Sequence, residues 1–488
     1  MLRKIRLVLA TIFFLLITLL FLDFTGTFHA YLGWLAKIQF LPAVLALNVV
    51  VVLVLVLLTL VFGRVYCSII CPMGVMQDVI ASLNRKKNRY SYSPAKSWLR
   101  YTMLVVLVVA LVAGVGSIVA LLAPYSSYGR IAQNLFQPIY IGVNNLLAVA
   151  AEHFESYAFY RKEVWVRSLP TFIIALVTFV FVFVLAWRNG RTYCNTICPV
   201  GTVLGFLARF SWFKIVVDDD KCKQCGKCIR NCKAACIKEK EMTIDYSRCV
   251  VCGNCLNNCN FGALSYKHKK QVEKVVETGK DNGRREFLVG AGLAVSTLAM
   301  AQEKKKVDGG LAVIEDKVQP ERHTPLTPPG SISAKNMAQH CTGCQLCVSE
   351  CPNDVLRPST GMTTLMQPTM SYERGYCRVE CNRCSSVCPA GAIKPITLAE
   401  KSSIQIGRAV WVKKNCIPVT EGKSCGNCAR HCPTGAIQMV HIDGDVTKPQ
   451  IPAVNTARCI GCGACEHLCP ARPFSAIYVE GNEIHTIN

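Results

Sequence analysis

The sequence predicts an α-helical membrane domain, with four spans plus a signal-like helix, combined with two α+β ferredoxin-like modules that hold 4Fe–4S clusters. Three observations lead to this prediction. Hydrophobic residues make up 51% of the 488 positions and charged residues only 17%, whereas a typical soluble domain has about 25% charged residues. There are 29 cysteines in a chain far too long to be a disulfide-stapled miniprotein. The net charge is +23, and basic residues gather between the apolar runs.

The apolar residues are concentrated in four runs that are each expected to cross a membrane. A helix needs about 20 apolar residues to span the hydrocarbon core. The four runs cover residues 7–22, 41–62, 103–123 and 169–187. A weaker apolar stretch, 135–151, contains Gln137, Pro138, Asn144 and Asn145 and is expected to be interfacial or re-entrant.

The distribution of Lys and Arg predicts which loops face the cytoplasm. The loop 64–100 holds seven basic residues and one acid, and 188–217 holds four basic residues and no acid. The loop 124–168 is nearly balanced. By the positive-inside rule the N-terminus, the 64–100 loop and the segment after Trp187 lie inside. Because the basic charge follows this topology, nucleic-acid binding is not expected.

A twelve-residue pattern, G-R-x-Y-C-x-x-I-C-P-x-G, occurs at 63–74 and again at 190–201, after the second and fourth apolar runs. The membrane part therefore resembles two helix hairpins related by duplication. Each copy carries a CxxxCP pair, Cys67 with Cys71 and Cys194 with Cys198. Repetition at matched positions favours a redox or metal-related role over the alternative, small buried packing residues.

Two cysteine runs after the fourth apolar run have the CxxCxxCxxxC spacing of bacterial ferredoxins. Four thiolates hold a cubane cluster, and in two-cluster folds the last cysteine of each run binds the cluster of the other run. One expected cluster is therefore held by Cys222, Cys225, Cys228 and Cys259, and the other by Cys249, Cys252, Cys255 and Cys232. Zinc is the weaker alternative, because zinc ribbons use separated CxxC pairs. Cys236 is interpreted as a packing residue.

Four further cysteine runs in the last third of the chain predict four more clusters. The runs are Cys341, Cys344, Cys347 and Cys351; Cys377, Cys381, Cys384 and Cys388; Cys416, Cys425, Cys428 and Cys432; and Cys459, Cys462, Cys465 and Cys469. No CxxCH motif occurs, so c-type haem is not expected. The spacing leaves two pairings open: first run with second, or first with fourth around second with third.

The segment between the two cysteine-rich parts has the layout of an export signal. Arg284 and Arg285 precede an apolar, small-residue stretch, 290–301, that ends in Ala-Met-Ala. The Arg pair resembles a twin-arginine signal, which would place everything after Ala301 outside the cytoplasm. Cleavage after Ala301 and retention as a fifth span both remain open, and a short amphipathic docking helix is the alternative.

These features divide the chain into five expected regions. They are a membrane domain (1–217), a cytoplasmic two-cluster ferredoxin domain (218–266), a linker with the signal-like helix (267–301), an extended linker (302–336) and a periplasmic four-cluster ferredoxin domain (337–488).

The spans, the CxxxCP pairs and the cysteine runs carry a resemblance to known families. Residues 1–266 resemble NapH, the membrane polyferredoxin of periplasmic nitrate reductase systems, and residues 284–488 resemble NapG, its exported four-cluster ferredoxin partner. The same membrane module occurs in NosR and CcoG proteins. The chain is therefore similar to a fusion of the NapH and NapG types.

The resemblance implies an electron-transfer protein with quinol dehydrogenase activity in the bacterial inner membrane. Electrons from a quinol would pass through six 4Fe–4S clusters, two cytoplasmic and four periplasmic, to a periplasmic terminal reductase or cytochrome. Oxidation of a quinol needs a proton acceptor near the membrane surface, and the candidates in the outer loops are Asp23, His29, Arg130, Glu152 and His153. The alternative is a redox maturation factor that supplies electrons for the assembly of a partner metalloenzyme.

Overall fold

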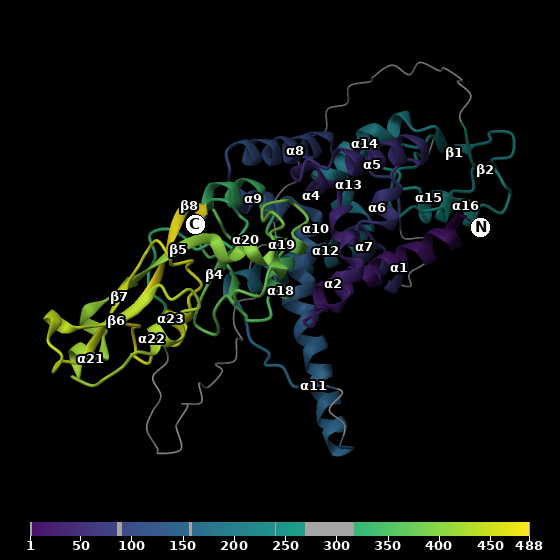
Figure 1. The fold of residues 1–488 in the computed structure, drawn as a ribbon. Helices are drawn as coiled ribbons and strands as arrows, with labels where there is room; N and C mark the ends of the chain where they lie inside the picture. The colour runs from purple at the N-terminus through teal and green to yellow at the C-terminus, as the bar shows by residue number, and fades with distance from the viewer. Residues whose placement is uncertain (1, 85–89, 156–158, 240, 269–316, 488) are drawn as a thin grey trace, which may run out of the picture.

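A computed structural model describes residues 2–84, 90–155, 159–239, 241–268 and 317–487. It is an elongated molecule in which a bundle of helices lies between a small module with strands β1 and β2 and a larger C-terminal module (Figure 1). The twin-arginine-like segment, including Ala301, lies outside the described residues.

Two helices in the described part of the chain are long and apolar enough to cross a membrane: α1 (Leu2–Leu22) and α12 (Leu169–Asn189). Each has 21 residues, which at 1.5 Å per residue makes about 31 Å. The hydrocarbon core of a bilayer is about 30 Å thick. The first and fourth expected spans therefore form single helices of membrane-spanning length.

The second and third expected spans are each broken into two helices. Residues 41–62 form α4 (Phe40–Leu45) and α5 (Val49–Phe62). The break occurs where the Asn48 side chain accepts a hydrogen bond from the Val51 N–H at 3.3 Å and so caps α5. Residues 103–123 form the end of α8 (Ser97–Val112) and α9 (Gly116–Leu122). At about 21 and 24 Å, α5 and α8 are shorter than the bilayer core.

The stretch expected to be interfacial or re-entrant forms the π-helix η1 (Ala132–Phe136) and one continuous helix, α11 (Gln137–His153). In Figure 1, α11 projects from the bundle. The bundle also contains the short helices α2 (Thr27–Leu32), α3 (Trp34–Lys37), α10 (Pro124–Ile131) and the 3₁₀-helix η2 (Ala208–Phe210).

The duplicated sequence pattern forms a duplicated structure. Helices α5 and α12 end at Gly63 and Gly190, whose φ angles of +79° and +69° lie in a region that favours glycine. Each glycine leads into a helix of five residues and then into a helix that begins with proline, as is common at the first helical position. These elements are α6 (Val65–Ile69) and α7 (Pro72–Leu83) in the first copy, and α13 (Thr192–Thr196) and α14 (Pro199–Leu207) in the second.

The small module is built on one antiparallel strand pair. Strands β1 (Phe213–Val217) and β2 (Leu264–His268) pair with Phe213 opposite His268, so the module begins a few residues before 218. Helices α15 (Lys227–Arg230) and α16 (Asn254–Asn258) follow the two cysteine loops. Ile215, Ile229 and Ile237 pack with the buried cysteines in its core.

The C-terminal module contains three antiparallel strand pairs and short helices. The pairs are β3 (Leu356–Pro358) with β4 (Pro368–Met370), β5 (Ile404–Trp411) with β8 (Ile477–Ile487), and β6 (Ile437–His441) with β7 (Gln450–Val454). The helices are α17 (Ala334–His340), α18 (Leu346–Glu350), α19 (Arg383–Val387), α20 (Leu398–Ser403), η3 (Lys413–Asn415), α21 (Ile417–Thr420), α22 (Asn427–Arg430), η4 (Ile442–Gly444) and α23 (Ala464–His467).

The described part of the expected extended linker packs on the C-terminal module. The Val318 N–H donates to the Pro473 carbonyl at 2.8 Å. Leu326 is fully buried, and the His485 N–H donates to the Ile332 carbonyl at 2.7 Å. Residues 317–333 are therefore structurally part of this module.

The two ferredoxin modules contact opposite ends of the long helices. At the start of α1, Leu2 packs on Gly253 of the small module, and beyond its end the Thr25 carbonyl accepts a hydrogen bond from Arg383 at 3.1 Å. Helix α12 runs the other way: Arg167, just before it, pairs with Asp354 at 3.5 Å. Beyond its end, the Arg191 N–H donates to the carbonyl of Lys233 in the small module at 2.8 Å.

Candidate functional site

Four of the six cysteine loops share a pair of positive φ angles on either side of one cysteine. In the first run, Gln224 and Gly226 flank Cys225 with φ of +50° and +69°. Successive N–H groups in such turns form an anion-binding concavity, which suits a negatively charged cluster. The same pair of positive φ values occurs at Val251 and Gly253, at Gly343 and Gln345, and at Gly461 and Gly463.

The small module gathers its cysteines into two groups of four. Quartet 1, formed by Cys222, Cys225, Cys228 and Cys259, lines one small cavity. Quartet 2 consists of Cys249, Cys252, Cys255 and Cys232. The pKa of Cys255 is raised by burial and then by the charges of the other three thiols, because these thiols lie close to it. This grouping is the one expected from the spacing. The spare thiol, Cys236, lies 3.6 Å from Cys232 and is buried.

In the C-terminal module the first and second runs combine. Quartet 3 consists of Cys341, Cys344, Cys347 and Cys388. Burial, and then the charges of Cys344 and Cys388, raise the pKa of Cys341, and the Cys388 charge adds to the effect of burial on the pKa of Cys347. Quartet 4, formed by Cys351, Cys377, Cys381 and Cys384, lines one cavity.

The third and fourth runs also combine with each other. Quartet 5, formed by Cys416, Cys425, Cys428 and Cys469, lines one cavity. Quartet 6 consists of Cys459, Cys462, Cys465 and Cys432. Burial, and then the charges of Cys432 and Cys459, raise the pKa of Cys462 to about 12. Of the two pairings that the spacing left open, the structure has first with second, and third with fourth.

The spacing of the thiols within each quartet bears on which metal centre fits. Four thiolates around one zinc ion lie about 3.8 Å apart, because each Zn–S bond is about 2.3 Å. In the described part of the chain no three Cys, His, Asp or Glu side chains lie close enough to hold a single ion. A cubane core holds its thiolates further apart, since four irons lie between them.

The four CxxxCP thiols, Cys67, Cys71, Cys194 and Cys198, are each only 4% exposed. They belong to the apolar core of the bundle, at the end where the small module packs. The two copies of the motif lie against each other, because the Arg64 guanidinium donates to the Cys194 carbonyl at 3.2 Å.

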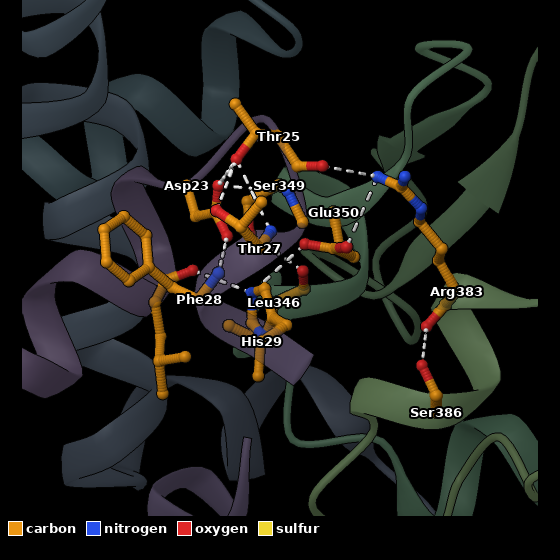
Figure 2. A network of polar contacts seen from close by, with 12 residues as sticks. Asp23, Thr25, Thr27, Phe28, His29, Leu346, Ser349, Glu350, Arg383 and Ser386 are labelled. Atoms are coloured by element: carbon orange, nitrogen blue, oxygen red, sulfur yellow. Dashed lines mark hydrogen bonds and ion pairs between the residues drawn. The ribbon is translucent and has the colours of Figure 1, made fainter. Parts of the chain in front are cut away.

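Two of the five candidate proton acceptors lie at the junction with the C-terminal module. Figure 2 shows Glu350 between His29 and Arg383; the His29 Nε2 is 3.3 Å from a Glu350 oxygen. Burial, and then the charge of Asp23, raise the pKa of Glu350 to about 7, whereas burial lowers the pKa of His29. At neutral pH this contact therefore joins a neutral imidazole to a carboxyl group that is partly protonated.

The Asp23 carboxylate is occupied by the backbone at the start of α2. It accepts hydrogen bonds from the N–H groups of Thr25 at 2.8 Å, Gly26 at 3.0 Å and Phe28 at 2.8 Å (Figure 2). Asp23 therefore has the role of a capping residue.

The other three candidates lie apart from this junction. Arg130 is fully buried and donates to the Ala120 carbonyl at 2.7 Å. Glu152 forms an exposed ion pair with Arg161, and the His153 ring packs edge-on against Phe154. The structure does not bring the five candidates together.

A cavity of about 400 Å³ lies beside quartet 3, which is within the usual range for small-molecule sites. Its apolar walls come from Leu135, Pro138, Ile141, Trp165 and Phe172, and its polar groups include Gln133, Asn134, Gln137, Lys162, Glu163, Arg167 and Gln345. None of the five candidate acceptors lines it. Gln345 directly follows Cys344 of quartet 3, and η1 supplies one wall; π-helices are frequent at functional sites.

In the sequence, this cavity is indicated by the polar residues that interrupt the apolar stretch 135–151. Gln137 lies in the cavity wall, and the Asn134 side chain donates to Gln345 at 3.2 Å. A second cavity of about 350 Å³ lies at the other end of the bundle. It is lined by residues that include Lys96, Leu185, Asn195 and Arg248.

Comparison with protein families identifies iron–sulfur domains along the chain. A 4Fe-4S binding domain matches residues 44–90 and 171–217, the two copies of the duplicated hairpin. Three 4Fe-4S dicluster domains match residues 245–355, 340–417 and 423–472. The first of these three joins cysteine runs that the structure places in different modules.

Curated relatives are ferredoxin-type and electron-transport proteins. The chain is 32% identical over 159 residues to the methylamine utilization ferredoxin-type protein MauM of Methylobacillus flagellatus, covering 31% of this chain and 67% of MauM. It is 24% identical to the putative electron transport protein YccM of Escherichia coli over 39% of this chain and 47% of YccM. It is 27% identical to the ferredoxin-type protein NapF of E. coli over 33% of this chain and 87% of NapF. The chain thus spans about half to two thirds of MauM and YccM.

Proposed function

Because this chain belongs to the ferredoxin-type proteins with 4Fe-4S binding and dicluster domains, we propose that it conducts electrons between a membrane quinol and a partner outside the cytoplasm. In this proposal quartets 1 to 6 each hold one 4Fe–4S cluster. Thiolates are soft ligands suited to iron–sulfur cores, and one-electron centres in series form a wire.

The observation that carries the proposal is the position of the two modules at opposite ends of α1 and α12. Both helices have about the length of a bilayer core. The small module contacts the ends that the positive-inside rule assigns to the cytoplasm, so the C-terminal module would lie on the other side. This argument does not depend on the signal-like segment.

The apolar surface of the bundle supports placement in a membrane. Helices α1, α5, α8, α11 and α12 carry exposed large apolar side chains, and soluble monomers rarely expose such extended apolar area. Examples are Val8, Leu15, Val50, Leu57, Val109, Val112, Ile139, Leu146, Val177 and Val180. The shorter helices α5 and α8 would then be part of a membrane domain with four apolar segments.

The cavity beside quartet 3 is the proposed quinol site. Its walls on α11 and α12 are apolar, as a quinol tail requires, and its polar end is formed by Gln133, Asn134 and Gln345. Oxidation of one quinol releases two electrons and two protons. The electrons would enter quartet 3 one at a time, and the protons would leave past Glu163, whose carboxylate is 86% exposed. The second cavity has the more polar lining and is the weaker candidate.

The experiment is quinol oxidation by the purified full chain in lipid nanodiscs with a soluble artificial electron acceptor. The proposal predicts continuous turnover, and loss of turnover in Cys344→Ser, which removes a ligand of the cluster beside the cavity. Cys236→Ser is the matched control, because this thiol belongs to no quartet. Clusters that dithionite reduces but quinol does not would contradict the quinol proposal. Reduction by quinol without repeated turnover would favour the assembly-factor alternative.

A further inference from the structure

The two CxxxCP motifs meet across an approximate two-fold relationship inside the helix bundle. The Arg64 guanidinium of the first copy donates to the Cys194 carbonyl of the second at 3.2 Å. Arg191 of the second copy donates to the Cys67 carbonyl of the first at 2.6 Å. The same backbone contact is therefore made twice, once in each direction, and it brings the two cysteine pairs to one place.

Two glycines make this close approach possible. A Cβ atom on Gly74 would lie 2.2 Å from the Cys67 carbonyl oxygen and 2.8 Å from Arg191. A Cβ atom on Gly201 would lie 2.3 Å from the Cys194 carbonyl oxygen and 2.9 Å from Arg64. Distances under 3.0 Å are not tolerated, so each motif needs its final glycine to fold back on its own first cysteine.

The four thiols lie in one part of the core. The Arg64 guanidinium contacts both the Cys67 sulfur at 3.8 Å and the Cys194 carbonyl at 3.2 Å. No disulfide joins them; all four are free and buried. Four thiols from two repeats therefore form a seventh set, the CxxxCP quartet, which the ferredoxin spacing rule does not describe.

The surroundings of the CxxxCP quartet carry an excess of buried positive charge. Arg6, Arg191 and Lys233 all pair with one carboxylate, Asp78, at 2.7, 2.8 and 3.6 Å. Arg64 is fully buried, and among the described residues no carboxylate pairs with it. Three buried guanidinium groups and the partly buried Lys233 thus have a single carboxylate among them, and buried charges without a partner are costly.

Polar groups already point at the sulfur atoms. The Gln77 amide is 3.1 Å from the Cys194 sulfur, and the Gly201 N–H donates to the Cys198 sulfur at 3.3 Å. An Arg64 nitrogen lies 3.8 Å from the Cys67 sulfur. Hydrogen bonds to sulfur are a usual feature of iron–sulfur sites, where they tune the reduction potential.

We propose that Cys67, Cys71, Cys194 and Cys198 together hold a seventh iron–sulfur cluster inside the helix bundle. A cubane core with four thiolates carries a net charge of about −2 when oxidised, which offsets the excess of buried cations. No three donors among the described residues are close enough for a single ion, so a polynuclear core fits better than zinc.

The position of this quartet gives the cluster a role in conduction. On one side, Arg64 donates to the carbonyl of Ser247, two residues before the first cysteine of quartet 2, at 3.0 Å. On the other side, Tyr193, which directly precedes Cys194, lies close enough to Arg130 for their charges to interact. Arg130 in turn lies 3.5 Å from the carbonyl of Gly343 in a loop of quartet 3. The seventh cluster would accept one electron from either neighbour and pass it to the other, which links the two modules.

The test is a count of clusters per chain by native mass spectrometry, with iron, sulfide and zinc analysis, on the full chain purified anaerobically. The expected result is seven clusters in the natural protein, and one fewer in Cys67→Ser and in Cys194→Ser. Cys236→Ser is the matched control: it also removes a buried thiol of this half of the chain and should retain all seven.

Six clusters in the natural protein, unchanged by Cys194→Ser, would overturn the proposal, and so would one zinc ion that disappears in that variant. The count on the natural protein needs no variant, so a variant that fails to fold does not affect the test. The count also measures no quinol oxidation, so failure of this inference and failure of the proposed function remain distinguishable.

Discussion

The backbone N–H of Cys377 donates a hydrogen bond to the carbonyl oxygen of Cys462 at 2.9 Å. This bond joins the second cysteine run of the C-terminal module to the fourth, and so places quartet 4 beside quartet 6. Quartet 6 in turn borders quartet 5. The charge of Cys428 in quartet 5 is one of the smaller causes that raise the pKa of the buried Cys465 thiol in quartet 6. The spatial order is therefore quartet 3, 4, 6 and 5. In Figure 1, α23 and α22 lie farther from the helix bundle than α18 and α19.

This order predicts different effects for two matched ligand substitutions. Cys462→Ser removes a ligand of quartet 6 and should stop electrons from reaching quartet 5 while quartets 3 and 4 are still reduced. Cys428→Ser removes a ligand of quartet 5 and should leave quartets 3, 4 and 6 reducible. Rapid-freeze paramagnetic resonance after addition of quinol distinguishes the clusters. Reduction of quartet 5 in Cys462→Ser would show that electrons follow the chain order instead.

The proposed quinol cavity predicts a second pair of contrasting variants. Ile141→Trp fills the cavity beside quartet 3, and Leu185→Trp fills the one at the other end of the bundle. Ile141→Trp should raise the KM for quinol at least about tenfold, equivalent to about 1.4 kcal/mol, with unchanged iron content. Leu185→Trp should leave the KM near its natural value. The reverse outcome would assign quinol to the second cavity.

The carboxylate of Asp78 is expected to be essential for stability. Although burial raises its pKa, the charges of Arg191 and Lys233 hold the pKa of Asp78 well below its usual range. Asp78→Asn leaves these buried cations without a partner and should cost about 3–5 kcal/mol, seen as a clear loss of thermal stability in detergent. The matched control is Asp218→Asn, which breaks an exposed pair with Lys221 and should cost about 0–1 kcal/mol. Equal losses of thermal stability in Asp78→Asn and Asp218→Asn would contradict the role of Asp78 as the shared partner of these cations.

A partly buried histidine predicts pH-dependent stability of the C-terminal module. Burial lowers the pKa of His485 from 6.5 to about 4, and its Nε2 contacts the Thr327 hydroxyl at 3.1 Å. Between pH 6.5 and 4 the unfolded chain binds the proton on His485 more tightly than the folded chain does. The contribution of the neutral His485 to the free energy of unfolding is therefore fully present above about pH 6.5 and is lost as the pH falls toward 4. From pH 7 to 5 the natural protein should lose about 1–2 kcal/mol more than His485→Gln. Identical pH profiles of thermal unfolding would contradict this.

Cysteine spacing predicted part of the cluster arrangement and left part open. Within the small module, the rule that the last cysteine crosses over indicated the groups that the structure forms around Cys255 and Cys259. For the four later runs the spacing is compatible with two pairings, because spacing describes a loop and not its neighbour. The choice depends on long-range packing, such as the contact of Cys377 with Cys462. The repeat predicted a redox or metal-related role for each CxxxCP pair, but it did not predict that the two pairs meet, because the two copies are about 130 residues apart in the chain.

Hydropathy predicted a single long helix correctly for the first and fourth apolar runs, but not for the second and third. The runs within α1 and α12 are single helices, whereas the Asn48 cap divides the second run. The candidate proton acceptors were chosen by residue type and loop position, and this choice cannot detect that Asp23 is occupied by backbone N–H groups. The cavity residues Gln133 and Gln345 are contributed by segments far apart in the chain, so only the folded structure brings them together.

The most direct test of the central claim is electron transfer across a sealed membrane. Proteoliposomes that contain the full chain would be given a membrane-impermeant reductant outside and would hold a trapped, impermeant acceptor inside. The account predicts reduction of the trapped acceptor that depends on the protein and is abolished by Cys252→Ser in quartet 2. An acceptor that stays oxidised, while the clusters facing the reductant become reduced, would contradict a wire that crosses the membrane.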